Sequence, residues 1–167
     1  MALLPAAGGG AEGTAAAQDL SLVSCPLGSQ TTTYNPGLHL TAPPGDVHLH
    51  STGNLGACVS TDLQHTGGTY SVDGSGPLTC TGGNSSGSGT VNWADPTTHP
   101  SRFTFTGAVS ERPAGDSVLV LTGSITSGDY SGHTLIETVV IASTDLTGCL
   151  TPEGLTTTSG TFSFTIA

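Results

Sequence analysis

The sequence predicts an all-β protein in which two antiparallel sheets form a β-sandwich held by two disulfides. Three observations predict this class. Short apolar runs alternate with polar residues or consist of β-branched residues, and turn signals separate them. Beyond the N-terminal segment, no stretch has helical periodicity with good helix formers. We expect residues 19–167 to form one sandwich domain, which is long enough for a stable core.

The expected strands follow one another along the chain. Alternation is clearest over 102–106 and 161–166, where aromatic residues or Ile alternate with Thr and Ser. Further strands are expected at 20–24, 31–34, 46–52, 69–73, 90–93, 118–121 and 138–141. Gly- and Asn-containing turn signals lie at 35–37, 73–74, 82–84, 114–116 and 128–129, and the Gly/Ser-rich stretch 87–89 resembles a linker.

Residues 1–18 precede the first expected strand and are rich in Ala and Gly. Leu3, Leu4 and Pro5 resemble the end of a signal peptide, and the alanines at 15–17 fit a small-x-small cleavage pattern before Gln18. A flexible N-terminal extension explains the same composition. Both interpretations stay open.

The charge balance excludes several partners. Only 8% of the residues are charged, and Arg102 and Arg112 are the only basic residues other than His against twelve acidic ones, which gives a net charge of −10. Binding of nucleic acids or anionic membranes requires clusters of cations, which this chain lacks. No apolar run approaches the roughly 18 residues that span a bilayer. We therefore expect neutral or basic partners.

Four cysteines, Cys25, Cys58, Cys80 and Cys149, are widely spaced and form no CxxC pair. This pattern favours two structural disulfides over a zinc site. Disulfides form in oxidising compartments, so we expect a secreted, extracellular protein.

A weak internal repeat bears on the disulfide pairing. Val47-x-Leu49-x-Ser51-Thr52, a cysteine loop and Gly68-Thr69-Tyr70 match Val139-x-Ile141-x-Ser143-Thr144, a cysteine loop and Gly160-Thr161-Phe162 at a spacing of about 91 residues. An internal duplication would add an extra hairpin to the second copy, at roughly 101–126. Equivalent pairing in both copies predicts the disulfides Cys25–Cys58 and Cys80–Cys149.

His48 and His50 are the weak candidates for metal ligands. They flank Leu49, so both imidazoles lie on one face of a strand, which Asp46 extends and which His39 could approach. The alternative is that Val47 and Leu49 face the core and the histidines face water. Because metal sites generally need a third firm ligand, we predict no metal or other cofactor.

Catalysis is not predicted either. No serine lies in a Gly-x-Ser-x-Gly elbow between a strand and a helix. Asp62, Asp145 and Glu153 lie near the cysteine loops, where the repeat could bring them together, although solvated loop acids explain them equally. Sugar binding would use exposed aromatic side chains. The candidates are Trp93, Tyr34, Tyr70 and Tyr130, of which Trp93 alternates with Val91 and is expected in the core.

The cysteine contexts resemble a family of small secreted actinobacterial β-proteins, the adaptor subunits of umbrella toxin particles. The resemblance covers about residue 22 to the C-terminus. It is carried by Ser24-Cys25-Pro26-Leu27-Gly28, Ala57-Cys58-Val59-Ser60-Thr61-Asp62, Ile125-Thr126-Ser127-Gly128 and Gly148-Cys149-Leu150-Thr151-Pro152. It implies a non-catalytic bridge between a lectin-bearing subunit and a repeat-built toxin scaffold in interbacterial competition. It also implies an N-terminal extension lodged in a cleft of the lectin-bearing partner.

The expected function is therefore a secreted, non-catalytic protein-interaction module. Its contacts are expected at the N-terminal segment and around the cysteine loops. The candidate partner-binding residues are Leu3, Leu4, Pro5, Asp62, Asp145 and Glu153. The alternative is a secreted sandwich that binds carbohydrate or metal.

Overall fold

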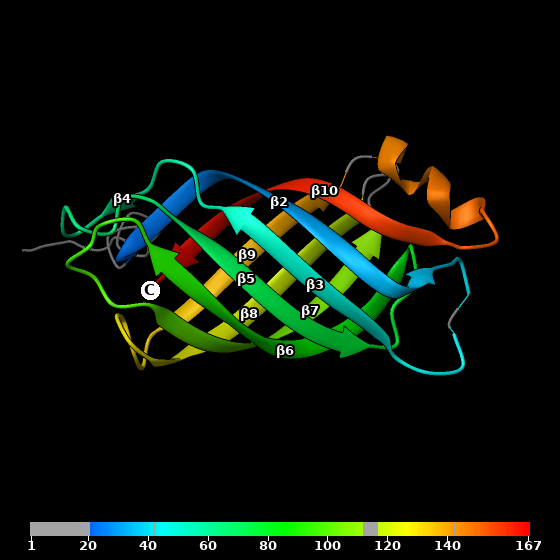
Figure 1. Ribbon diagram of the computed structural model, residues 1–167, viewed down its shortest axis with the longest axis horizontal. Coiled ribbons are helices and arrows are strands. Elements are labelled where there is room, and N and C mark those ends of the chain that lie inside the picture. Colours follow the sequence, from blue (N-terminus) through cyan, green and yellow to red (C-terminus); the bar gives the residue numbers. More distant parts are fainter. Residues whose placement is uncertain (1–20, 42, 112–116, 142) are drawn as a thin grey trace, which may run out of the picture.

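A computed structural model describes residues 21–41, 43–111, 117–141 and 143–167 of the chain (Figure 1). In this part of the chain, eight antiparallel strands form a closed barrel, so the predicted two-sheet sandwich is wrong. The strands are β2 (Val23–Leu38), β3 (Val47–Asn54), β5 (Gly68–Gly76), β6 (Gly82–Trp93), β7 (Ser101–Glu111), β8 (Ser117–Ser127), β9 (Thr134–Ile141) and β10 (Leu155–Ile166). The short strand β4 (Val59–Ser60) pairs with the start of β2.

Closure comes from the pairing of the last strand with the first. Each barrel strand is hydrogen-bonded to the next one along the chain, and β10 pairs with β2 from Leu155↔Leu38 to Ile166↔Val23. Sandwiches and barrels both place alternate residues of each strand in the interior, so the alternation in the sequence fits either architecture. The pairing of β10 with β2 decides between them, and the sequence pattern does not reveal it.

Several predicted turns lie inside strands. β2 continues through Asn35-Pro36-Gly37. Its pairing with β3 ends at Asn35, and its pairing with β10 is irregular near Leu38. Pro36 therefore removes no regular ladder hydrogen bond. The stretch 87–89, predicted to be a linker, is part of β6 and pairs with both β5 and β7.

Glycines in the strands make room for aromatic rings inside the narrow barrel. A Cβ atom on Gly53 would come within 2.0 Å of the Tyr70 ring. A Cβ atom on Gly89 would come within 2.4 Å of the Phe103 ring. An eight-stranded barrel has an interior that side chains nearly fill, so large residues require small ones beside them. This pairing accounts for some of the glycines in the strands, whereas others, such as Gly76, face backbone atoms of neighbouring strands.

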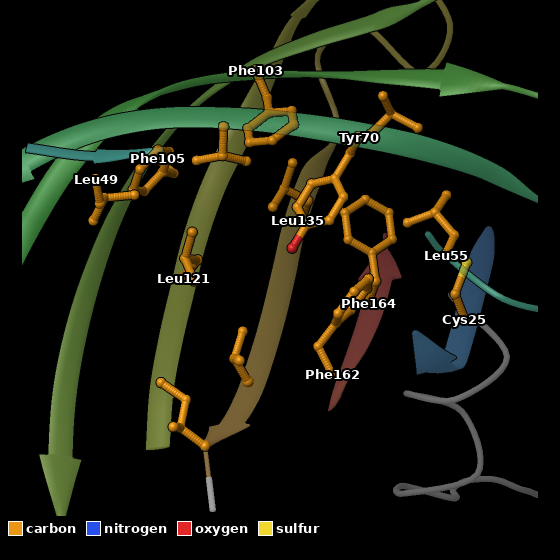
Figure 2. Packing of buried hydrophobic residues seen from close by; sticks show 14 of the residues in the cluster. Cys25, Leu49, Leu55, Tyr70, Phe103, Phe105, Leu121, Leu135, Phe162 and Phe164 are labelled. Atoms are coloured by element: carbon orange, nitrogen blue, oxygen red, sulfur yellow. The ribbon is translucent and has the colours of Figure 1, made fainter. Parts of the chain in front are cut away.

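The two ends of the barrel differ. Alternating strand directions place the loops 55–67, 94–100 and 128–133 at one end, named here the Cys58 end. The loops 39–46 and 77–81 and the 3-10 helix η1 (Ser143–Leu150) lie at the other, the Cys149 end, and Figure 1 shows β4 and η1 far apart. Buried side chains, including those of Phe103, Leu135, Phe162 and Phe164, fill the interior toward the Cys58 end (Figure 2).

The disulfides confirm the predicted pairing. Cys25 bonds Cys58 and ties the start of β2 to the loop before β4, whereas Cys80 bonds Cys149 and ties the loop before β6 to η1. Both bridges indicate an oxidising, extracellular compartment. In the described residues, no helix has the length and apolar character needed to cross a membrane.

The two copies of the repeat share an outline but point in opposite directions. One copy is β3, the Cys58 loop and β5, and the other is β9, η1 and β10. The predicted extra hairpin is formed by β7 and β8. Because the copies are five strands apart in the barrel, their loops lie at opposite ends. Asp62 is therefore at the Cys58 end, whereas Glu153 and the η1 position 145 are at the Cys149 end, and the repeat does not bring them together.

Candidate functional site

Glu137 is a carboxylic acid inside the barrel. It lies on β9, where alternation also points Leu135, Val139 and Ile141 inward. Only 2% of its surface is exposed. Burial of an acid among apolar neighbours costs free energy unless the group is neutral or well partnered. This position therefore needs an explanation beyond packing.

The strand register places Glu137 in one row with a buried serine. Ser85 of β6 pairs with Gly107 of β7, Gly107 pairs with Leu121 of β8, and Leu121 pairs with Glu137. All four residues face the interior. Ser85 and Glu137 are three strand spacings of about 4.8 Å apart along the wall, so they approach the interior from different sides.

A cavity of about 40 Å³ lies inside the barrel, between this row and the Cys149 end. Its apolar lining consists of Leu38, Leu49, Val72, Leu78, Leu119, Leu121, Ile141 and Leu155, together with the disulfide-bonded Cys80. Its polar lining consists of Gln30, Thr32, Tyr34, Ser51, Tyr70, Thr79, Ser85, Glu137 and Thr158. One buried water needs roughly 10–15 Å³, so the space fits about three waters or one molecule of about four heavy atoms.

The hydrogen bonds next to Glu137 form a chain in which each group donates to the next. The Tyr70 hydroxyl lies 2.7 Å from Glu137 Oε2 and also contacts Gln30 Oε1. Gln30 Nε2 donates to Thr32 Oγ1 at 3.1 Å, and Thr32 Oγ1 lies 2.8 Å from Ser51 Oγ. The Tyr70 hydroxyl has one proton, and Gln30 Oε1 can only accept, so Tyr70 donates to Gln30. The contact between Tyr70 and Glu137 then needs a proton from Glu137. The chain is complete when Glu137 is protonated.

The electrostatics agree with a neutral Glu137 in the empty barrel. Burial raises the pKa of Glu137 to about 7, although the hydrogen bond from Tyr70 opposes this shift. Burial and the neighbouring Glu137 also raise the pKa of Tyr70. Among the described residues, no Lys or Arg pairs with Glu137: the chain has no lysine, Arg102 is exposed, and Arg112 lies outside the described residues.

Ser85 is the second unusual group of the cavity. Ser85 is 5% exposed, and its Oγ atom is buried without a hydrogen-bond partner among the described residues. Gly107 lies beside it, and a Cβ atom there would come within 3.2 Å of Ser85 Oγ. A buried hydroxyl without a partner loses its hydration and gains nothing in return. A molecule in the cavity would supply the missing partner.

A different polar cluster closes the Cys58 end. His65 Nδ1 lies 2.8 Å from Asp62 Oδ1, and His65 Nε2 lies 2.7 Å from Asp129 Oδ2. Both ring nitrogens face carboxylates, so both donate and the imidazole is positively charged. Burial lowers the pKa of His65, but the hydrogen bonds with Asp129 and Asp62 outweigh burial and raise it. The ring packs edge-on against Trp93 and Tyr130, and we name this group of side chains the plug cluster.

The predicted metal candidates lie on the outer face of β3. His48 and His50 alternate with the buried residues Val47 and Leu49, as the second interpretation of the sequence predicts. His50 Nδ1 lies 2.7 Å from Asp73 Oδ1. In the described part of the chain, no group of three His, Cys, Asp or Glu residues is placed to hold a metal ion.

The other predicted site residues are scattered. Leu3, Leu4 and Pro5 lie outside the described residues, as does the side chain of Asp145. Asp62 belongs to the plug cluster, and Glu153 is exposed in the loop before β10. Trp93 is buried as predicted, and its indole Nε1 donates to Ser101 Oγ at 2.9 Å, so it offers no exposed sugar platform.

Sequence reasoning missed Glu137, Tyr70 and Ser85 as members of one site. Period-two alternation from Leu135 to Ile141 was a signal for Glu137, because it assigns an acid to the buried face. Nothing comparable marks Ser85, whose inward position follows from the register of a Gly/Ser-rich strand.

Comparison of the chain with protein-family models, with curated proteins and with solved structures finds no match. The functional interpretation of the cavity therefore depends on its geometry alone.

Proposed function

We propose that the protein is an extracellular, non-catalytic binding protein that holds a small ligand inside its barrel. The observation that carries this proposal is the cavity with the buried acid Glu137 and the unpartnered hydroxyl of Ser85 in its wall. A barrel that served only as a scaffold would be more stable with apolar side chains at these positions. The interior of an eight-stranded barrel is either filled by side chains or holds one small ligand, and the cavity in this barrel fits the second case.

The lining of the cavity argues against catalysis. Among the described lining residues, Glu137 is the only carboxyl group, whereas glycoside hydrolysis uses a pair. Among the described lining residues, no histidine lies beside Ser85, and Glu137 is three strands away along the barrel wall and makes no hydrogen bond with it. A single acid without a second carboxyl group or an activated nucleophile beside it fits recognition of a ligand better than catalysis.

A ligand screen with a cavity-filling control tests the proposal. Methyl resonances of the cavity leucines Leu119 and Leu121 are followed by NMR while small polar molecules are added. We expect saturable shifts in the wild type and none in Ser85→Leu, which fills the cavity and removes the unpartnered hydroxyl. A complete screen without cavity shifts, or equal shifts in both proteins, would contradict the proposal.

A second candidate function is the adaptor role that the resemblance implies. Three large apolar side chains at the Cys58 end, near the Cys25–Cys58 bridge, are exposed: Leu27 by 81%, Val59 by 75% and Leu63 by 89%. Exposed apolar side chains that gather at one place characteristically mark protein contacts. This observation favours a partner subunit at the Cys58 end, far from the cavity.

Co-purification from the native secretions tests the adaptor role. We expect a protein partner to be recovered with the wild type and lost with the triple variant Leu27→Ser, Val59→Ser, Leu63→Ser. The matched control is Leu150→Ser, since Leu150 is 78% exposed at the opposite end. A monomer without partners, or equal loss with the control, would contradict this role.

A further inference from the structure

We propose that the ligand is a small organic cation, with a primary ammonium group at Glu137 and a second hydrogen-bonding group at Ser85. This inference rests on the proposed function and names the chemical class that the cavity selects. Three independent features support it: the missing countercharge of Glu137, the donors and acceptors of the lining, and the size of the cavity.

The first feature is that the Glu137 carboxylate has no cation beside it among the described residues. A buried carboxylate is stable when a cation and hydrogen bonds compensate its lost hydration. Among the described residues, no Lys or Arg fulfils this role, and the chain contains no lysine. The net charge of −10 also raises the local concentration of cations around the protein. A cationic ligand would supply the charge that the described residues do not.

The groups that face Glu137 are compatible with this partner. The strands paired with β9 present Leu121 from β8 and Phe164 from β10 at this register. The other titratable groups in the described lining are the phenols Tyr70 and Tyr34. An ammonium group carries three donors and no acceptor, so it donates to the Glu137 carboxylate, and the single Tyr70 proton is then shared between Glu137 Oε2 and Gln30 Oε1.

Binding would release a proton. In the empty barrel the chain of hydrogen bonds is complete with protonated Glu137. When the ammonium ion enters, the Glu137 O–H bond breaks, its proton leaves to the solvent, and the carboxylate pairs with the ammonium. The affinity should therefore fall as the pH decreases below the pKa of Glu137, since protonation then competes with the ligand.

The size of the cavity limits the ligand to about four heavy atoms. Ethanolamine has this size, with an ammonium group at one end and a hydroxyl at the other. Ethylene glycol and glycolate are nearly isosteric and replace the cation by a neutral and an anionic group. With so few atoms, we expect a dissociation constant no tighter than about 10⁻⁵–10⁻⁴ M.

The test titrates the full-length protein with ethanolamine, ethylene glycol and glycolate at pH 8 and pH 5.5, with the methyl resonances of Leu119 and Leu121 as readout. At pH 8 we expect ethanolamine to bind at least tenfold more tightly than ethylene glycol, and glycolate not to bind. At pH 5.5 we expect ethanolamine binding to weaken. Glu137→Gln should abolish the preference for ethanolamine.

Ser85→Ala provides a second variant that does not alter the acid. It should weaken ethanolamine binding and leave binding of ethylamine, which lacks the hydroxyl, unchanged. Equal binding of ethanolamine and ethylene glycol, or an unchanged preference in Glu137→Gln, would overturn the cationic ligand and leave the proposed function intact. Absence of cavity shifts with these compounds and with the whole screen would overturn both.

Discussion

Glu137 occupies an inward position of β9, between the inward-facing apolar residues Leu135 and Val139. Because Glu137 is buried in contact with Tyr70, the folded protein favours the protonated form of its carboxyl group. At the Cys58 end, the ring of His65 between Asp62 and Asp129 is held in its charged form. These two residues give the stability of the protein a dependence on pH that can be measured separately for each.

The first prediction concerns Glu137→Gln. The pKa of Glu137 is raised from 4.5 to about 7, so the folded state binds a proton that the unfolded state releases between these values. Its contribution to stability is present below pH 4.5 and declines as the pH rises through 7, by at most about 1.4 kcal/mol per pH unit. We expect urea unfolding to show that Glu137→Gln gains stability relative to the wild type between pH 5 and pH 8. A constant difference would contradict the assignment.

The second prediction concerns His65→Gln. The pKa of His65 is raised in the folded state, so its stabilisation is complete below the ordinary value of about 6.5 and is lost as the pH rises through the folded value. We expect the advantage of the wild type over the variant to shrink above pH 6.5 in thermal unfolding. The control is His99→Gln, because the His99 side chain is exposed and lies 3.6 Å from Asp129. An equal effect of the control would refute the role of the plug cluster.

The strands illustrate how much of an element the sequence predicts. The alternation in 102–106 and 161–166 correctly predicts β7 and β10, since it reports which face is buried. Gly74 of β5 resembles a turn signal because its actual use, space for the Phe105 ring, depends on a residue from another strand. Gly53 and Tyr70 are seventeen positions apart and meet only through the register of β3 with β5.

The third prediction concerns Gly53→Ala. The added Cβ atom would lie 2.0 Å from the Tyr70 ring and 2.9 Å from the Ser29 carbonyl oxygen, so the ring must move. Overpacking of this kind costs about 1–3 kcal/mol. We expect a lower midpoint of urea unfolding for Gly53→Ala and little change for the control Gly45→Ala, which has open space around it. Equal midpoints would show that the ring adapts without cost.

The whole molecule is a closed barrel with one bridge at each end. Sequence reasoning predicted the all-β class and both disulfides, because these depend on local patterns and on the repeat. It did not predict closure, because closure depends on the pairing of β10 with β2 across 117 to 143 residues, from Leu155↔Leu38 to Ile166↔Val23. For the same reason it did not predict the interior site, whose members come from β2, β5, β6 and β9.

The fourth prediction concerns the bridges. On the chain-entropy model, loops of 33 and 69 residues correspond to stabilisations of about 3.7 and about 4.4 kcal/mol. We expect Cys25→Ser/Cys58→Ser and Cys80→Ser/Cys149→Ser each to lose several kcal/mol in urea unfolding. Only the second pair, whose bridge borders the cavity, should also weaken ligand binding while the protein remains folded. Equal weakening by both pairs would contradict the location of the site.

A crystal structure of the wild-type protein, grown with a mixture of small amines, alcohols and amides, would show whether the interior of the barrel is a binding site. We expect electron density for one organic molecule in the cavity, within hydrogen-bond distance of Glu137 and extending toward Ser85. Density for water alone in the cavity, with organic molecules confined to the outer surface, would contradict this expectation.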